Sequence, residues 1–100
     1  MHTMLRVTTP VEKGNSTILD GSLPKVIEEI TKRIHPEASY FMALHGKRTA
    51  LFFFEMKDSS EIPQIAEIAF MGLNAEVEFI PVMNQAELQK GLAAWPASKG

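Results

Sequence analysis

The sequence predicts one α+β domain with the element order strand–helix–strand–strand–helix–strand and a short C-terminal helix. Three observations support this fold class. Four apolar segments have the length of strands, two longer segments space their apolar residues three and four positions apart, and 100 residues leave room for a single domain. The apolar fraction of 45% is ordinary for a globular chain. We therefore expect residues 1–100 to form one domain, with an ordered core over about residues 4–95.

The first element is a strand that leads into a loop. Over residues 4–11, Leu5 and Val7 alternate with Arg6, which is the period of a strand. Pro10 ends the hydrogen bonding of this strand, because proline has no amide donor. Residues 12–21 are polar and contain two glycines, and this composition predicts a loop.

A helix follows the loop. The apolar residues between Leu23 and Ile34 recur at the spacing of one buried helix face. Ser22 is the expected N-cap, and Pro24 lies in the first turn, where a missing amide costs nothing. Pro36 ends the helix, because the residue before a proline avoids helical geometry.

The next two strands form a hairpin. They span residues 38–45 and 49–57, and the Gly46-Lys47 dipeptide between them fits a type II′ turn. This turn sets Phe41 opposite Phe52. Both faces of the hairpin are largely apolar, whereas a sheet with one face in water alternates apolar and polar residues. The sheet is therefore expected to be covered on both faces.

The second half of the chain returns to a helix and a strand. Residues 58–60 supply capping side chains for a helix whose apolar face runs from Ile62 to Leu73. Asn74 marks the end of that helix. Residues 76–82 alternate in polarity and are expected to form the last strand.

A short helix ends the predicted fold. Asn84 and Glu87 match a variant capping box for a helix over residues 85 to about 94. Trp95-Pro96 closes the ordered chain, and residues 97–100 are expected to fray.

This element order is the split βαβ arrangement of the ferredoxin-like fold. Right-handed connections place the first and third strands in the centre of the sheet and both helices on one of its faces. The side chains expected on the other face, here called the open face, are Arg6, Thr8, Tyr40, Met42, Leu44, Leu51, Phe53, Glu55, Glu78, Ile80 and Val82. An exposed patch this apolar marks a binding surface, so we expect two copies to pack their open faces together as a homodimer.

The layout, with its open apolar sheet face, is similar to the dimeric α/β-barrel superfamily. The stretches GNSTILDGSLPKVIEEI, PEASYF, GKRT and AEVEFIPVM also resemble one family of short uncharacterised bacterial proteins. The resemblance covers the chain from Leu5 to about Leu92 and implies a ferredoxin-like fold that pairs as a dimeric α/β barrel. The superfamily includes antibiotic-biosynthesis-type monooxygenases and muconolactone isomerases. The family itself brings no assigned activity, so no catalytic residue is carried over.

Three charged residues stand out on the open face. Arg6, Glu55 and Glu78 lie on three adjacent strands of the predicted sheet, and a charge on an apolar face is costly unless it is paired. In a functional interpretation, Arg6 holds an anionic or carbonyl group of a ligand and Glu55 acts as a base. In a structural interpretation, an Arg–Glu ion pair sets the register of the dimer.

Four further residues are candidates for ligand contacts. Tyr40 on the open face can donate a hydrogen bond into the same space, or simply serve as an amphipathic core residue. Asn15 lies in the predicted first loop, where it orients a ligand or makes a turn. His45 and Arg48 are predicted neighbours at the hairpin tip, where they bind a carboxylate or phosphate, or only face solvent.

Composition excludes several classes of function. The formal net charge of -2 argues against a nucleic-acid partner, and zero cysteines exclude disulfides and thiol chemistry. No apolar run approaches the length of a membrane span and no secretory signal is present, so we expect no membrane partner and a cytoplasmic protein. No histidine pair has ligand spacing and no glycine-rich phosphate loop is present, so we predict no metal and no cofactor.

Two classes of function follow from the open face. The first is a homodimer, or a larger assembly, that binds a small apolar molecule in a pocket between the sheet faces. The alternative is a non-catalytic interaction or regulatory module whose open face serves only dimerisation. The resemblance adds a cofactor-independent monooxygenase or isomerase as a further alternative. The residues themselves do not decide whether the protein is an enzyme.

Overall fold

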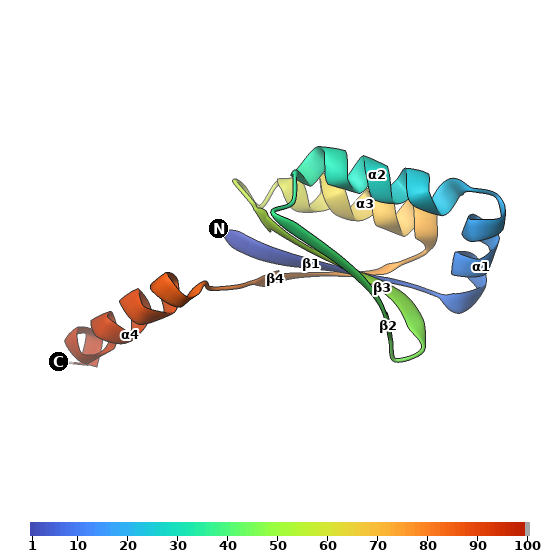
Figure 1. Ribbon diagram of the computed structural model, residues 1–100. Helices are drawn as coiled ribbons and strands as arrows, with labels where there is room; N and C mark the ends of the chain where they lie inside the picture. Colours follow the sequence, from blue (N-terminus) through green and yellow to red (C-terminus); the bar gives the residue numbers. More distant parts are fainter. Residues whose placement is uncertain (100) are drawn as a thin grey trace.

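The computed structural model describes the backbone of residues 1–99 and the side chains of residues 1–96 (Figure 1). The strands and helices, in chain order, are β1 (His2–Thr9), α1 (Val11–Leu19), α2 (Ser22–Ile34), β2 (Ala38–Leu44), β3 (Lys47–Glu55), α3 (Glu61–Leu73), β4 (Glu76–Pro81) and α4 (Gln85–Lys99). The predicted strands and helices are all present, and α1 is added to them.

The strands form one four-stranded sheet in the order β2-β3-β1-β4, in which every neighbouring pair is antiparallel. Helices α2 and α3 lie side by side on one face of this sheet (Figure 1). This α+β arrangement is compatible with the ferredoxin-like fold. The first and third strands are central, as predicted, because each of the two strand–helix–strand connections leaves room for one strand in between.

The core lies between the sheet and the helices α2 and α3. Alternate residues of β1 and β3 are buried, among them Leu5, Phe52 and Phe54, which are at most 1% exposed. Ile30 of α2 and Leu73 of α3 close over them and are fully buried. Burial of each such side chain contributes roughly 1.5–3 kcal/mol. The predicted division of the strands into a helix-facing and an open face is confirmed.

Helix α1 replaces the loop predicted for residues 12–21 and corrects that prediction. The helix begins after Pro10, whose carbonyl accepts a bond from the Gly14 amide at 2.8 Å. Thr17 is 2% exposed and its hydroxyl donates to the Lys13 carbonyl at 2.8 Å. The glycine and the small polar residues suggested a turn, but the burial of Gly14 and Thr17 in the folded chain favours a helix.

The hairpin between β2 and β3 also differs from the prediction. Its two turn residues are His45 and Gly46, with φ of 53° and 75°, and two positive φ angles define a type I′ turn. The register is therefore shifted by two residues, so that Phe41 lies opposite Ala50 and not Phe52. A shift of two residues leaves every side chain on its predicted face, because side chains alternate with a period of two.

The helix ends follow the predicted signals with small changes. The N-cap of α2 is Gly21, with a φ of 79°, and not Ser22. Asp20 lies just before it, and its Oδ1 accepts a hydrogen bond from the Ser22 amide at 2.8 Å. The prediction of Ser22 as N-cap is thereby corrected. Helix α3 starts at Glu61, whose Oε2 accepts from the Lys57 amide at 2.7 Å. Asn74 ends α3 in the left-handed conformation, as predicted.

Helix α4 extends away from the rest of the fold (Figure 1). The predicted capping box is confirmed, since the Glu87 amide donates to Asn84 Oδ1 at 2.8 Å and the Asn84 amide donates to Glu87 Oε1 at 3.1 Å. The helix continues through Pro96 to Lys99, beyond its predicted end near residue 94. Fraying of residues 97–100 stays a prediction: the backbone of residues 97–99 is helical, and Gly100 lies outside the described residues. None of the helices in the described part of the chain has the length and apolar character of a bilayer span.

Candidate functional site

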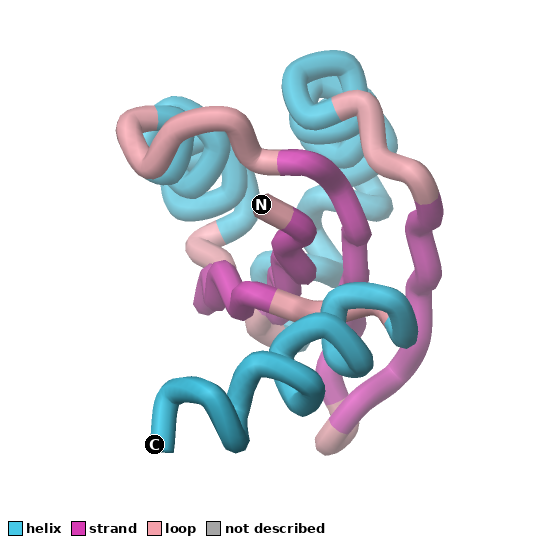
Figure 2. Tube along the Cα trace, turned by 90° about the vertical axis from the view of Figure 1, so that its left-hand side faces the viewer, coloured by secondary structure: helices cyan, strands magenta, loops and turns pink. Residues whose placement is uncertain are grey.

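The open face is the side of the sheet opposite α2 and α3 (Figure 2). The strand register arranges its side chains in rows that cross the sheet from β2 to β4. One row is Ala38, Phe53, Met4 and Ile80, and the next is Tyr40, Leu51, Arg6 and Glu78. These two neighbouring rows make a band of mostly apolar side chains across four strands, with a single ion pair at one end of it.

Arg6 and Glu78 form that ion pair, as the shared face predicted. Arg6 Nη2 lies 2.6 Å from Glu78 Oε1, and Arg6 Nε donates to the same oxygen at 2.7 Å. The two side chains are 31% and 48% exposed, so water screens their attraction. An ion pair this exposed contributes about 0–1 kcal/mol, which is too little to make it a main source of stability.

Glu55 does not join Arg6 and Glu78, although it shares the open face with them. Its register partner is His2, which lies four positions from Arg6 along β1 and so roughly 13 Å away. The Met1 amino group donates a hydrogen bond to Glu55, and this bond lowers the pKa of the Glu55 carboxyl below its ordinary value. The predicted trio is therefore an Arg6–Glu78 pair and a separate Glu55.

A polar hollow of about 180 Å³ lies beside the Arg6–Glu78 pair. Its lining residues are Arg6, Thr8, Leu44, His45, Lys47, Thr49, Glu76 and Glu78. Lys47 Nζ is 3.6 Å from Glu76 Oε2, which makes a second ion pair at the rim. The sequence prediction missed Lys47 because it assigned that residue to the turn. Glu76 was detectable, since it stands two residues before Glu78 and so shares its face.

A larger hollow of about 470 Å³ lies at the opposite end of the open face. Its lining includes His2, Tyr40, Phe53 and Val82. Tyr40 is 58% exposed, and its ring meets that of Phe53 edge to face with centroids 6.3 Å apart. The Tyr40 hydroxyl is thus available to a ligand at this end, while its ring adds to the apolar band.

Asn15 and Arg48 lie together on the helix-covered side of the sheet. Arg48 Nη1 donates to Asn15 Oδ1 at 3.1 Å. Asn15 belongs to helix α1 and not to a loop, which is why it reaches Arg48. The predicted pairing of His45 with Arg48 is wrong, because the type I′ turn places His45 at the tip and Arg48 opposite Ala43.

Comparison of the chain with models of known families, with curated proteins and with solved structures gives no match. Among the described side chains, those of residues 1–96, no three histidine, aspartate or glutamate residues converge as a metal site would require. The site is therefore described by its own geometry, which is an apolar band between a small polar hollow and a larger, aromatic one.

Proposed function

We propose that this protein is a homodimer that binds a small apolar molecule between the open faces of its two sheets. The observation that carries the proposal is the apolar band of Phe53, Met4, Ile80 and Leu51, which the two sheet-covering helices leave uncovered. Contiguous apolar surface of this kind is rarely left in water and usually marks an interface or a binding groove.

The charge pattern of the open face supports a second copy of the chain as its partner. Arg6 is paired with Glu78, and Lys47 with Glu76, so the basic groups beside the band have carboxylate partners within their own chain. Burial of an unpaired charge is costly. A face whose charges are already paired within its own chain can therefore be buried against the same face of a second copy. A two-fold axis makes such a contact self-complementary.

The hollows at the two ends of the face support a ligand between the copies. The larger hollow has a volume of about 470 Å³, which falls within the usual range for small-molecule sites of about 300–1,000 Å³. Tyr40 and Phe53 give it an aromatic wall, and the Tyr40 hydroxyl offers one polar contact. A second face laid across the hollow encloses it and excludes water from the ligand.

The homodimer is tested by a charge placed in the centre of the band. Leu51 lies opposite Arg6, so Leu51→Lys sets two positive charges side by side on the open face. We expect the wild type to sediment at twice the chain mass of 11.1 kDa and Leu51→Lys at the monomer mass. Leu19→Lys is the matched control, because Leu19 is 87% exposed at the end of α1 and should leave the dimer intact. A monomeric wild type at every concentration overturns the proposal.

The ligand is tested by native mass spectrometry on protein purified gently from its own host. We expect the wild-type dimer to carry extra mass that the Leu51→Lys monomer has lost. A dimer that carries no extra mass, and whose open face takes up no apolar probe, contradicts the small-molecule part of the proposal. That result favours the alternative, an interaction module whose open face serves only dimerisation.

A further inference from the structure

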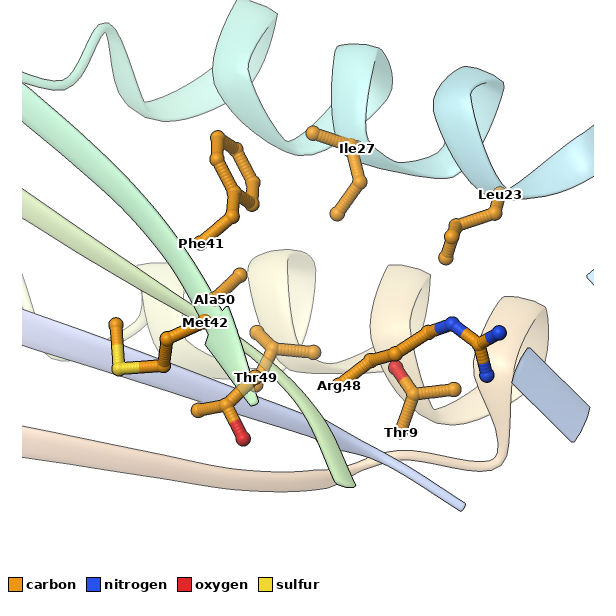
Figure 3. Close-up of a pocket in the computed structure, with 9 residues that line it drawn as sticks. Thr9, Leu23, Ile27, Phe41, Met42, Arg48, Thr49 and Ala50 are labelled. Atoms are coloured by element: carbon orange, nitrogen blue, oxygen red, sulfur yellow. The ribbon is translucent and has the colours of Figure 1, made fainter. Parts of the chain in front are cut away.

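A pocket of about 190 Å³ lies on the helix-covered side of the sheet, beneath α2 (Figure 3). Its lining residues are Val7, Thr9, Leu23, Ile27, Phe41, Met42, Arg48, Thr49 and Ala50. Figure 3 shows Leu23 and Ile27 directed from α2 towards the strands below. The pocket shares Thr49 with the polar hollow of the open face and no lining residue with the larger hollow, and its other residues do not need the homodimer proposed above.

The pocket exists because the helices leave the edge strand β2 partly uncovered. Phe41 of β2 points to the helix-covered side but is 61% exposed, whereas Phe52 of the neighbouring strand is fully buried on that side. The two rings meet edge to face, with centroids 5.9 Å apart. The result is an apolar slot that opens at the edge of the sheet, where a ligand can enter without disrupting the core.

Arg48 is the single charged residue in the lining of this slot. Its guanidinium lies near Leu23 and Thr9 (Figure 3) and donates one bond, from Nη1, to the neutral amide of Asn15. Among residues 1–96, no carboxylate comes within ion-pair distance of Arg48, in contrast to Arg6 with its partner Glu78. A guanidinium has five N–H donors, so most of those on Arg48 remain available to a ligand.

Gly14 of α1 makes room for the Arg48 side chain. A Cβ atom at this position would lie 2.6 Å from Arg48 Nη1 and 3.2 Å from Arg48 Cδ. Glycine weakens a helix interior relative to alanine, yet here it allows the helix to pass directly over the guanidinium. Gly14 and Asn15 together therefore place the positive charge beside the apolar slot.

We propose that this pocket binds a small hydrophobic monocarboxylate. The carboxylate accepts paired N–H bonds from Arg48, whose planar fork matches its two oxygens. The apolar body of the ligand lies between Ile27, Leu23 and Phe41. A dry protein cavity of about 150 Å³ holds benzene, so about 190 Å³ suits a compound the size of benzoate. One arginine balances one negative charge, which favours a monocarboxylate over a phosphate dianion.

The test is a titration of the ¹⁵N-labelled protein with benzoate and with its neutral analogue benzamide, followed by NMR. We expect benzoate to shift the amide signals of Thr9, Ile27 and Arg48, and to bind about tenfold or more tightly than benzamide. Equal affinity for the two probes overturns the proposal. So does an absence of shifts at millimolar benzoate, or shifts confined to the open face.

Three variants separate the charge from the slot. Arg48→Met keeps an apolar stem and should lose about tenfold or more in benzoate affinity, with benzamide affinity unchanged. Gly14→Ala should displace the guanidinium and weaken benzoate binding while the helix content measured by circular dichroism is retained. Ile27→Phe should fill the slot and weaken both probes. Unchanged benzoate affinity in Arg48→Met and Gly14→Ala contradicts the role of the arginine.

Two controls make the result specific. Arg33→Met removes an exposed arginine of α2 that bonds to Gln64 of α3 and does not line the slot, so it should bind benzoate as the wild type does. Leu51→Lys, which is designed to break the homodimer, should also retain benzoate binding. Loss of binding in either control shows that the effect does not come from Arg48, and it overturns the assignment of the ligand to this slot.

Discussion

Phe52 and Phe53 are adjacent in the chain but lie on opposite faces of the sheet, and this contrast gives a sharp prediction. Phe52 is fully buried between the sheet and the helices and packs edge to face on Phe41. Phe53 lies on the open face, is half-buried and contacts Tyr40. The same substitution, Phe to Ala, should therefore have a very different cost at the two positions.

The magnitudes follow from burial. Phe52→Ala leaves a cavity in the core and should cost about 3–5 kcal/mol of unfolding free energy. For a domain of this size each kcal/mol corresponds to about 4–8 °C in Tm, so the transition should fall by at least about 12 °C. Phe53→Ala removes a half-buried ring and should cost about 1–2 kcal/mol within one chain. Since natural domains are stable by only about 5–15 kcal/mol, Phe52→Ala should be close to unfolding.

Urea unfolding followed by circular dichroism at several protein concentrations measures both costs. The loss in Phe52→Ala should not depend on concentration, because Phe52 faces its own helices. The loss in Phe53→Ala should grow with concentration, because the open face stabilises the proposed dimer of the wild type. If Phe53→Ala is as costly as Phe52→Ala at the lowest concentration, the assignment of the two faces is refuted.

Three further predictions concern the hairpin turn, the hydrogen bonds of Asp20 and the last helix. Gly46→Ala should lower stability to urea by about 1–2 kcal/mol, because φ is 75° there, whereas Lys47→Ala should have little effect. Hydrogen bonds from Ser22 hold the pKa of Asp20 below its ordinary value of 3.8, so the carboxylate stabilises the fold above pH 3.8 and this contribution is lost as the pH falls towards the folded pKa. The Tm difference between wild type and Asp20→Asn should therefore disappear in acid, and a difference that is constant with pH contradicts a stabilising role for the Asp20–Ser22 hydrogen bonds. Asn84→Ala should cost α4 about 1 kcal/mol and reduce helical circular dichroism, while an unchanged spectrum contradicts the capping box.

Much of the fold was predictable from local patterns. The apolar spacing between Leu23 and Ile34 identified α2, and the alternation of β1 separated buried Leu5 from Arg6 on the open face. The same alternation brought Arg6 and Glu78 to one face, where the structure pairs them. These assignments depend only on the helical and strand periods, so they survive an error in the register.

The parts that were not predictable depend on contacts between distant segments. Gly14 and Asn15 are residue types that favour turns, and the sequence therefore predicted a loop. In the structure both belong to helix α1 and contact Arg48 of β3. The pocket under α2 is formed partly by Arg48, which this contact holds in place, and partly by the exposed ring of Phe41. Neither feature could be predicted from the spacing of residues along the chain.

Local patterns along the chain were enough to predict the order of the main strands and helices, their faces and the apolar character of the open face. Side-chain periodicity is a local property of the chain, which is why it can be read along the sequence. The hairpin register, the distance of Glu55 from Arg6 and the contact of Arg48 with Asn15 became visible only in the folded chain. Each of these depends on backbone angles at a turn or on packing between segments far apart in the chain. Such interactions produce no periodic pattern in the sequence, so they could not be predicted from it.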